Sequence, residues 1–259
     1  MKSIPKNNIS GLAIVYNEEK NISELINNLN FVDELIIIDS FSTDKTLEII
    51  KSFKNVKVIQ NKFTDFTSQR NLALNNANCD WVLFLDADER IPEKLKLEII
   101  EIIKKPKAND AYYFYRKFMF KGKPLNFSGW QTDKNFRLFK REKAHYINER
   151  LVHETLEVNG TIGVLKNKLI HYSYNDYKIY KSKMINYGKL RAKELYLKKT
   201  KHNFFKYIFK PIYKFAYDYF IRLGILDGQK GIVICYLNAL SVAIRYRELK
   251  KIINSTSTK

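Results

Sequence analysis

The sequence has little acid for its amount of base, no closely spaced cysteines, and no glycine-rich phosphate loop. Its 46 Lys and Arg outnumber 27 Asp and Glu, a formal net charge of +19. Cys79 and Cys235 lie far apart without a CxxC or Cys/His spacing, so the sequence indicates neither a disulfide framework nor a zinc site. Neither GxxxxGKS/T nor GxGxxG occurs, which argues against a P-loop NTPase and a dinucleotide dehydrogenase.

Long hydrophobic runs are also absent. The first eight residues contain no apolar stretch of signal-peptide length, and the longest apolar window, residues 231–244, is interrupted by polar residues. At 259 residues with 45% hydrophobic content, the chain can still bury a substantial core. We therefore expect a cytoplasmic protein with one large domain, or one domain and an appendage.

The positive charge is concentrated in the C-terminal half. Residues 1–130 carry 19 basic against 17 acidic side chains, whereas residues 131–259 carry 27 against 10. Between residues 177 and 222 there are 13 Lys and Arg with aromatic residues interleaved. Such helices suit the surface of an anionic membrane, although the aromatic side chains could also pack on the rest of the protein.

The first hundred residues alternate between two hydrophobic patterns. Apolar runs of strand length lie at residues 9–16, 34–39, 56–60 and 81–85. Helical spacing of apolar residues follows each run, within residues 22–29, 47–53, 66–77 and 95–102. Continuous apolar runs are typical of parallel strands that are buried on both faces. The alternation predicts an α/β fold with a doubly wound sheet and right-handed crossovers.

Acid-rich sequences follow three of these strands, namely YNEE, DSFSTD and DADE. Ligands of such sheets bind at the carboxyl ends of the strands. In an extended chain Asp86 and Asp88 point to the same side, roughly 6.5–7 Å apart, and two such carboxylates repel each other unless a cation lies beside them. An isolated Asp-x-Asp is more often a solvated turn, but its place after a buried strand favours a divalent cation completed by a diphosphate.

Four segments in register, AIVYNEEKNI, DELIIIDSFSTDKTLEI, QRNLAL and DWVLFLDADE, resemble the family 2 glycosyltransferases, which have the GT-A fold. The resemblance covers residues 8–105 and implies that this half binds a UDP-sugar. It implies nucleotide-sugar contacts from Tyr16, Asn17, Glu18, Asp39, Arg70 and Asp86. It also implies that Asp88 holds Mg²⁺ or Mn²⁺, with Asp86 and His171 as further candidate ligands. From the residues alone, Asp39 could instead cap the next helix and Arg70 could lie on a helix surface.

The second half must supply the acceptor site and the base. Direct inverting transfer needs a carboxylate that removes the proton of the acceptor hydroxyl. The stretch from RLF through VHE to a later His resembles the lipopolysaccharide inner-core beta-1,4-glucosyltransferase subgroup. This resemblance implies Glu154 as the base, with Asp133 and Glu149 as alternatives. Spacing alone favours a surface carboxylate at Glu154.

The resulting domain prediction is a GT-A catalytic domain and a helical extension near the membrane. The catalytic domain covers residues 1–175, with the nucleotide-sugar half at 8–105 and the acceptor half at 106–175, and the extension covers residues 176–259.

We expect an inverting, metal-dependent transfer of a hexose, with glucose favoured, from a UDP-sugar to a phosphorylated lipid-linked saccharide such as a lipopolysaccharide or lipooligosaccharide core. The enzyme would act at the inner face of the cytoplasmic membrane. The alternatives are a glycosyltransferase for another surface polysaccharide or glycolipid, and a basic nucleic-acid- or membrane-binding protein without catalysis. No nucleic-acid recognition motif occurs, and the glycine-rich loop of sugar nucleotidyltransferases is missing after the first strand.

Overall fold

The computed structural model describes residues 8–147, 155–174, 176–201 and 203–257. The chain divides into two compact units. The first, called the sheet unit, comprises residues 1–116 and 134–171, and the second, called the helical unit, comprises residues 117–133 and 172–259.

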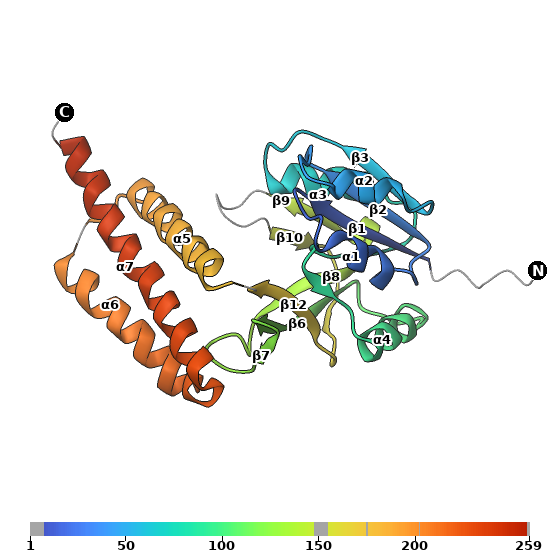
Figure 1. Cartoon of the computed structure of the whole chain (residues 1–259). Helices are drawn as coiled ribbons and strands as arrows, with labels where there is room; N and C mark the ends of the chain where they lie inside the picture. The colour runs from blue at the N-terminus through green and yellow to red at the C-terminus, as the bar shows by residue number, and fades with distance from the viewer. Residues whose placement is uncertain (1–7, 148–154, 175, 202, 258–259) are drawn as a thin grey trace, which may run out of the picture. The chain divides into compact units, whose positions relative to one another are not determined.

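The sheet unit is built on four parallel strands in the order β3-β2-β1-β4 (Figure 1). They are β1 (Ile9–Val15), β2 (Glu34–Asp39), β3 (Val56–Gln60) and β4 (Trp81–Phe84). The register pairs Val15 with Asp39 and Asp39 with Gln60, so these strands end at one edge of the sheet. The predicted parallel strands are confirmed.

Side chains of these strands alternate between two covered faces, which explains the continuous apolar runs. The connecting helices are α1 (Ile22–Asn28), α2 (Thr46–Lys51), α3 (Phe66–Asn75) and α4 (Glu93–Ile103). Leu35 and Ile37 of β2 belong to a core that includes buried residues of α1, α2 and α4. Ile36 and Ile38 belong to a second core that includes residues of α3. The fully buried positions therefore need apolar side chains on both sides of the strand.

Antiparallel strands extend the sheet beyond β4, so the complete sheet is mixed. β8 (Lys134–Lys140) pairs with β4, and β6 (Ala111–Phe120) pairs with β8. The short elements of this part are β5 (Glu89–Arg90), η1 (Arg141–Lys143), β9 (Ala144–Ile147), β10 (Thr155–Val158), β11 (Ile162–Val164) and β12 (Leu169–Tyr174). β5 pairs with β12 and β9 pairs with β10, both antiparallel.

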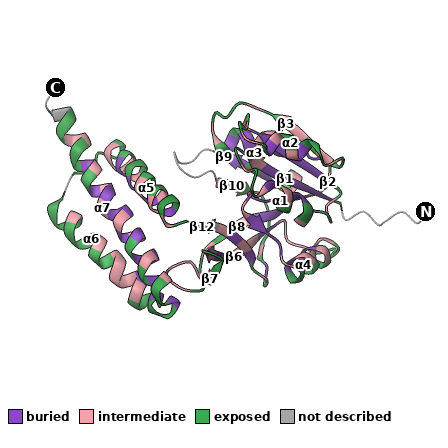
Figure 2. Cartoon of the chain, viewed as in Figure 1, coloured by how far each residue is buried: buried purple, intermediate pink, exposed green. Residues whose placement is uncertain are grey.

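The helical unit contains three helices, and α7 lies between α5 and α6 (Figure 1). Its elements are β7 (Lys123–Leu125), α5 (Tyr177–Leu197), α6 (Phe204–Ala216), the π-helical turn η2 (Tyr217–Ile221), η3 (Gly224–Asp227) and α7 (Gln229–Ser257). Buried side chains line α7, whereas α6 has no buried residue (Figure 2). The predicted C-terminal helices are confirmed.

Two buried aspartates organise the polar interior of the helical unit. The backbone N–H groups of Asn126 and Phe127 donate to Asp227 at 3.0 Å each, and the Ser128 hydroxyl donates to it at 2.8 Å. Asp218 is fully buried and accepts hydrogen bonds from Lys214 and Asn238, both at 2.9 Å. Since a buried carboxylate is costly unless it is paired, these contacts fix the 126–128 loop and the turn after α6.

Candidate active site

The Asp-x-Asp segment is a turn at the end of β4. β4 ends at Phe84, and the Glu89 backbone N–H donates to the Asp86 carbonyl at 3.0 Å, closing the turn over Ala87 and Asp88. The extended geometry expected for this tripeptide is therefore wrong. The turn sends the two aspartates to different partners, so their roles separate.

Asp86 lies between two arginines. Its carboxylate accepts from Arg70 at 2.9 Å and also pairs with Arg137, and its side chain keeps 30% exposure. Burial alone would raise the pKa of Asp86, but Arg137 and Arg70 lower it by more and hold it well below its usual range. Arg70 comes from α3 and its guanidinium stacks 4.5 Å from the centre of the Phe84 ring, so it is buried rather than on a helix surface. Asp86 is thus a carboxylate whose charge two arginines stabilise.

Glu89 forms the second half of the same charge cluster. It is fully buried, accepts from Arg137 at 2.7 Å, and lies 3.5 Å from a guanidinium nitrogen of Arg116. Glu89 also accepts the Asp86 backbone N–H at 3.1 Å, which fixes the turn from inside. Burial lowers the pKa of Arg137. The negative charges of Asp86 and Glu89 raise it by more, so the pKa lies above its usual value.

Sequence reasoning missed this cluster. Neither Arg137 nor Arg116 was a predicted site residue, and Glu89 had no clear role. The available signal was Arg137 itself, an arginine in the apolar strand segment NFRLF, because a charge in such a position usually has a buried partner.

Asp88 pairs with His171. The Asp88 carboxylate oxygen and His171 Nε2 lie 3.1 Å apart, with His171 7% exposed. The antiparallel register of β5 and β12 sets Glu89 opposite His171, and this pairing brings the imidazole to the turn. The two residues are separated by 83 positions in the sequence.

The Asp88–His171 pair fits a divalent cation that is shared with a substrate. An oxygen and a nitrogen at this separation can both contact one ion, and Mn²⁺ accepts both kinds of ligand. Across the described ranges, no group of three or more His, Cys, Asp or Glu could hold a metal ion. Such a site is therefore incomplete without oxygens from a ligand, which is how Mg²⁺ is commonly held on a diphosphate.

Asp39 closes the carboxyl end of β2. It is fully buried, and its oxygens accept from the Ser42 backbone N–H at 3.2 Å and from Gln60 Nε2 at 3.0 Å. The alternative role of Asp39 as the cap of α2 is not seen, because Asp44 accepts the Thr46 N–H at 3.0 Å instead. Asp39 therefore ties the ends of β2 and β3 together at the carboxyl edge of the parallel strands.

The loop after β1 is joined to the loop after β2. The Asn17 backbone N–H donates to the Ser42 hydroxyl at 2.9 Å, and its side-chain oxygen accepts the Thr43 N–H at 2.8 Å. Asn17 has a positive φ of 56°, a conformation that asparagine tolerates better than most residues. This arrangement leaves the neighbouring Tyr16 ring 56% exposed at the sheet edge.

The pKa of Glu18 is raised by its surroundings at this edge of the sheet. Burial is the main cause that raises its pKa, a hydrogen bond from Asn21 lowers it, and the negative charges of Asp88, Asp44 and Asp86 raise it again. A carboxyl group with a raised pKa among other carboxylates indicates a place where a cation is favoured.

Three consecutive residues of α3 hold the surrounding elements. Gln69 donates to the Ser40 hydroxyl at 3.1 Å, Arg70 pairs with Asp86, and Asn71 exchanges two hydrogen bonds with the backbone of Tyr146 at 2.8 and 3.0 Å. The QRN sequence therefore links the loop after β2, the Asp-x-Asp turn and β9.

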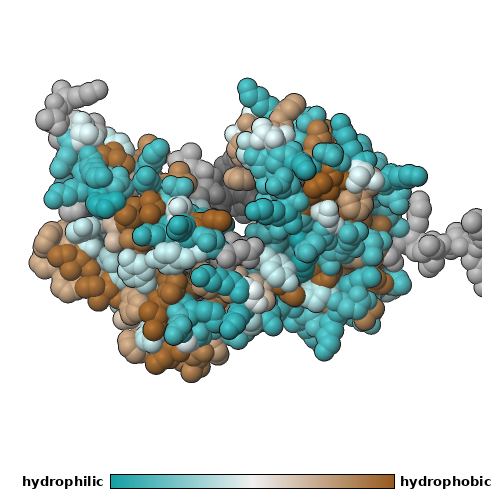
Figure 3. All heavy atoms as spheres, viewed as in Figure 1, coloured by the Kyte–Doolittle hydropathy of each residue, from teal (hydrophilic) through white to brown (hydrophobic). Residues whose placement is uncertain are grey.

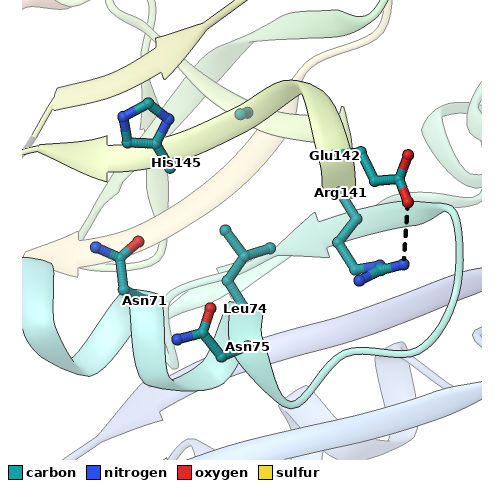
Figure 4. Close-up of a pocket in the computed structure, with 7 residues that line it drawn as sticks. Asn71, Leu74, Asn75, Arg141, Glu142 and His145 are labelled. Carbon is teal, nitrogen blue, oxygen red and sulfur yellow. Dashed lines mark ion pairs between the residues drawn. The ribbon is translucent and has the colours of Figure 1, made fainter.

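A pocket of about 630 Å³ lies beside α3 (Figure 4). Asn71, Leu74, Asn75, Arg141, Glu142, Ala144 and His145 line it. None of these residues is a predicted nucleotide, metal or base residue, so this hollow does not define the active site.

Two of the three predicted base residues fall outside the described ranges. Glu154 and Glu149 lie outside the described residues. Asp133 belongs to the helical unit, where its backbone N–H donates to the Trp130 carbonyl at 3.1 Å. In the sheet unit, Arg70 pairs with Asp86 and His171 pairs with Asp88, while Asp39 lies at the end of β2.

A family model for glycosyl transferase family 2 matches residues 12–158, more than half of the chain. The chain belongs to this family and is a glycosyltransferase. An uncharacterized glycosyltransferase of Rickettsia typhi is 29% identical over 94% of this chain and 87% of its own length. The lipopolysaccharide core biosynthesis glycosyltransferase LpsC of Rhizobium meliloti is 25% identical over 94% of both chains.

The fold is also that of known transferases. A mannosyltransferase of Pyrobaculum calidifontis, solved with GDP-mannose and Mn²⁺, matches all of this chain and 84% of its own with a TM-score of 0.53. Its sequence identity is 13%, so the similarity concerns the fold alone. The predicted GT-A fold is confirmed.

Proposed function

We propose that the protein is an inverting, metal-dependent glycosyltransferase that moves a hexose, with glucose favoured, from a UDP-sugar to a lipopolysaccharide or lipooligosaccharide core. The observation that carries the proposal is the Asp88–His171 pair beside the arginine-held Asp86, at the carboxyl edge of the parallel strands. A donor diphosphate supplies the oxygens that this pair lacks for holding a cation.

In this proposal the sheet unit binds the donor. Tyr16, Asn17 and Glu18 line the pocket for the nucleotide together with Asp39, and Asp86 is held by Arg70 and Arg137 near the ribose or the donor sugar. Asp88 and His171 hold Mg²⁺ or Mn²⁺. The ion, when bound, stabilises the negative charge that develops on the departing diphosphate.

Glu154 is the proposed base, with Asp133 and Glu149 as alternatives. A carboxylate takes the proton of the acceptor hydroxyl while that oxygen attacks the anomeric carbon from the face opposite the diphosphate. The anomeric configuration therefore inverts. The proposed division at residue 175 assigns donor binding and catalysis to residues 1–175 and acceptor recruitment at the cytoplasmic membrane surface to residues 176–259.

The acceptor class is supported by LpsC, whose described role is lipopolysaccharide core biosynthesis. The positive C-terminal half suits a phosphorylated saccharide, since residues 131–259 contain 27 basic and 10 acidic side chains. Another surface polysaccharide or glycolipid is the alternative acceptor.

The decisive experiment is a panel of radiolabelled UDP-sugars with the purified protein, Mn²⁺ or Mg²⁺, and lipopolysaccharide core as acceptor. We expect transfer from one UDP-hexose, with inversion seen by NMR of the product. Asp88→Asn is expected to lower activity at least about 100-fold. Loss of a residue that only supports a metal ligand already costs up to about 100-fold, and Asp88 is proposed as a direct ligand. Glu48→Gln, an exposed carboxylate on α2, is the matched control.

The outcomes separate the parts of the proposal. Hydrolysis or transfer of none of the UDP-sugars with either ion would overturn the donor assignment. Full activity in Asp88→Asn would contradict the metal role alone. Transfer only to a different glycolipid would show that the proposed lipopolysaccharide acceptor is wrong. Glu154→Gln should abolish transfer while UDP still binds, and the same result for Glu149→Gln or Asp133→Asn instead would move the base.

A further inference from the structure

Helix α6 and the turn after it expose a continuous apolar surface. We propose that this surface, called the docking face, binds an anionic lipid bilayer. It consists of Phe204, Phe205, Ile208, Phe209, Ile212, Tyr213, Phe220 and Ile221, which are exposed large apolar side chains. In Figure 3, hydrophobic side chains gather over α6 and the segment that follows it.

The docking face is too apolar to be an ordinary solvated helix surface. Phe205 is 70% exposed and Phe209 59%, and none of the 13 residues of α6 is buried. The two phenylalanine rings are stacked with centroids 6.2 Å apart, so their exposure is shared by one patch. Contiguous exposed apolar surface of this kind marks a binding face on a water-soluble unit.

The arrangement of charge on α6 identifies the occupant. Lys206, Lys210 and Lys214 recur every four residues along one flank of the apolar stripe, and the sequence of α6 contains no acidic residue. Lys214 pairs with buried Asp218 at 2.9 Å, and Lys210 Nζ lies 5.8 Å from the centre of the Tyr246 ring of α7. Lys206 and Lys210 both remain exposed. Lysines beside an apolar stripe extend their ammonium groups toward anionic headgroups while their stems contact the acyl boundary.

The same charge argues against the other occupants. Two copies of the chain joined through this face would bring two lysine rows together, which is unfavourable. A nucleic acid would satisfy the lysines but would leave the side chains of Ile208, Ile212 and Ile221 in water. An anionic bilayer satisfies both the apolar and the basic parts.

The geometry predicts that α6 lies in the plane of the membrane surface. Its 13 residues span roughly 20 Å, which is less than the roughly 30 Å of a hydrocarbon core. In the described part of the chain, no helix is long and apolar enough to cross a bilayer. This inference deepens the proposed function, on which it rests for its purpose: a bound enzyme meets a lipid-linked acceptor at the membrane surface.

The test is co-sedimentation of the full chain with vesicles, without donor or acceptor. Vesicles of phosphatidylglycerol and phosphatidylcholine should bind the protein, and phosphatidylcholine alone should bind it weakly. Replacing both Lys206 and Lys210 with Gln should lower affinity for the anionic vesicles roughly 25-fold, about fivefold for each lysine. Phe205→Glu with Phe209→Glu should abolish sedimentation.

Matched controls keep the result specific. Leu97→Glu alters an apolar residue of α4 that is 53% exposed, and Lys54→Gln removes an exposed charge of the sheet unit. Both should bind vesicles like the unchanged protein. Thermal unfolding of each variant shows whether it is folded.

Three results would overturn the docking face: equal sedimentation of the Phe205→Glu, Phe209→Glu variant, self-association that depends on those two residues, or tight binding to a mixed-sequence oligonucleotide with none to vesicles. Because no sugar donor is present, a failed transferase assay leaves this test unaffected. Vesicle binding with no transfer would reject the proposed donor and acceptor alone.

Discussion

Replacing Arg137 with Met tests whether the charge cluster behind the Asp-x-Asp turn holds the sheet unit together. Arg137 is 4% exposed and pairs with both Asp86 and Glu89. Methionine keeps much of the side-chain length but removes the cation and its hydrogen bonds. The variant therefore leaves two carboxylates facing each other with less compensation, while the apolar packing of β8 changes little.

The expected loss can be set from the partners that remain. Removing one member of a buried ion pair costs about 3–5 kcal/mol, mostly because the other charge stays buried without its partner. Asp86 keeps Arg70 at 2.9 Å and is 30% exposed, and Glu89 keeps Arg116 at 3.5 Å. We therefore expect the lower end, about 3 kcal/mol of unfolding free energy.

The loss should depend on pH with a definite sign. The folded protein holds the pKa of Asp86 below its unfolded value, so Asp86 stabilises the fold above about pH 4 and this contribution is lost as pH falls through the folded pKa. Without Arg137 the pKa of Asp86 rises. Protonation then relieves the repulsion in the variant, and the difference from the unchanged protein should shrink as pH falls through the pKa of Asp86 in the variant.

Urea unfolding followed by tryptophan fluorescence measures this difference. The chain has two tryptophans, and in a Trp130→Phe background the remaining Trp81 reports on the sheet unit. Arg247→Met removes an exposed ion pair and should change stability by less than about 1 kcal/mol. A loss below about 1 kcal/mol for Arg137→Met, or a loss that does not vary with pH, would refute the reasoning.

Three further predictions concern the helical unit. Asp227→Asn weakens the three hydrogen bonds that hold the 126–128 loop, so the free energy of unfolding in urea should fall by about 2–3 kcal/mol. An unchanged urea midpoint would show that the loop does not depend on the charge of Asp227. Gly188→Ala should destabilise by about 1–3 kcal/mol, because the added Cβ would lie 2.7 Å from the Ser241 carbonyl oxygen; a rise in melting temperature, as for an exposed helical glycine, would contradict this close approach. Burial raises the pKa of Cys235 to about 11, so in a Cys79→Ser background a thiol reagent should label the protein only after unfolding, and rapid labelling of the native protein would be inconsistent with that burial.

The sequence was sufficient to predict the parallel strands because the residues of each strand show by themselves that both faces are buried. The runs LIII and WVLFL are apolar at every position, as is typical of strands covered on both faces. The ends of β2 and β4 could therefore be located, and with them Asp39 and Asp86. The contact of Arg70 with Asp86 could also have been predicted from the sequence. Side chains alternate along a strand, so Asp86 lies on the same side as Phe84, which faces α3.

The partners of Glu89 and Asp88 could not be predicted in this way. Arg137 lies 48 residues from Glu89, and His171 lies 83 residues from Asp88. Their meeting depends on the register of antiparallel strands added beyond β4, and no local pattern encodes that register. His171 became a candidate ligand only through a family resemblance. Arg137 begins the RLF part of the same resemblance, but no role followed from it, and Arg116 had no such signal.

The charge cluster also changes the interpretation of the acid surplus at the end of β4. The sequence suggested that Asp86 and Asp88 share a cation, but Asp86 and the neighbouring Glu89 are already compensated by Arg70, Arg137 and Arg116. The arginines make the turn rigid and nearly neutral before any ligand arrives. Asp88, 29% exposed and beside His171, is then the carboxylate best suited to hold an ion. Loss of Asp88 should therefore affect chemistry more than folding, and loss of Arg137 should affect folding first.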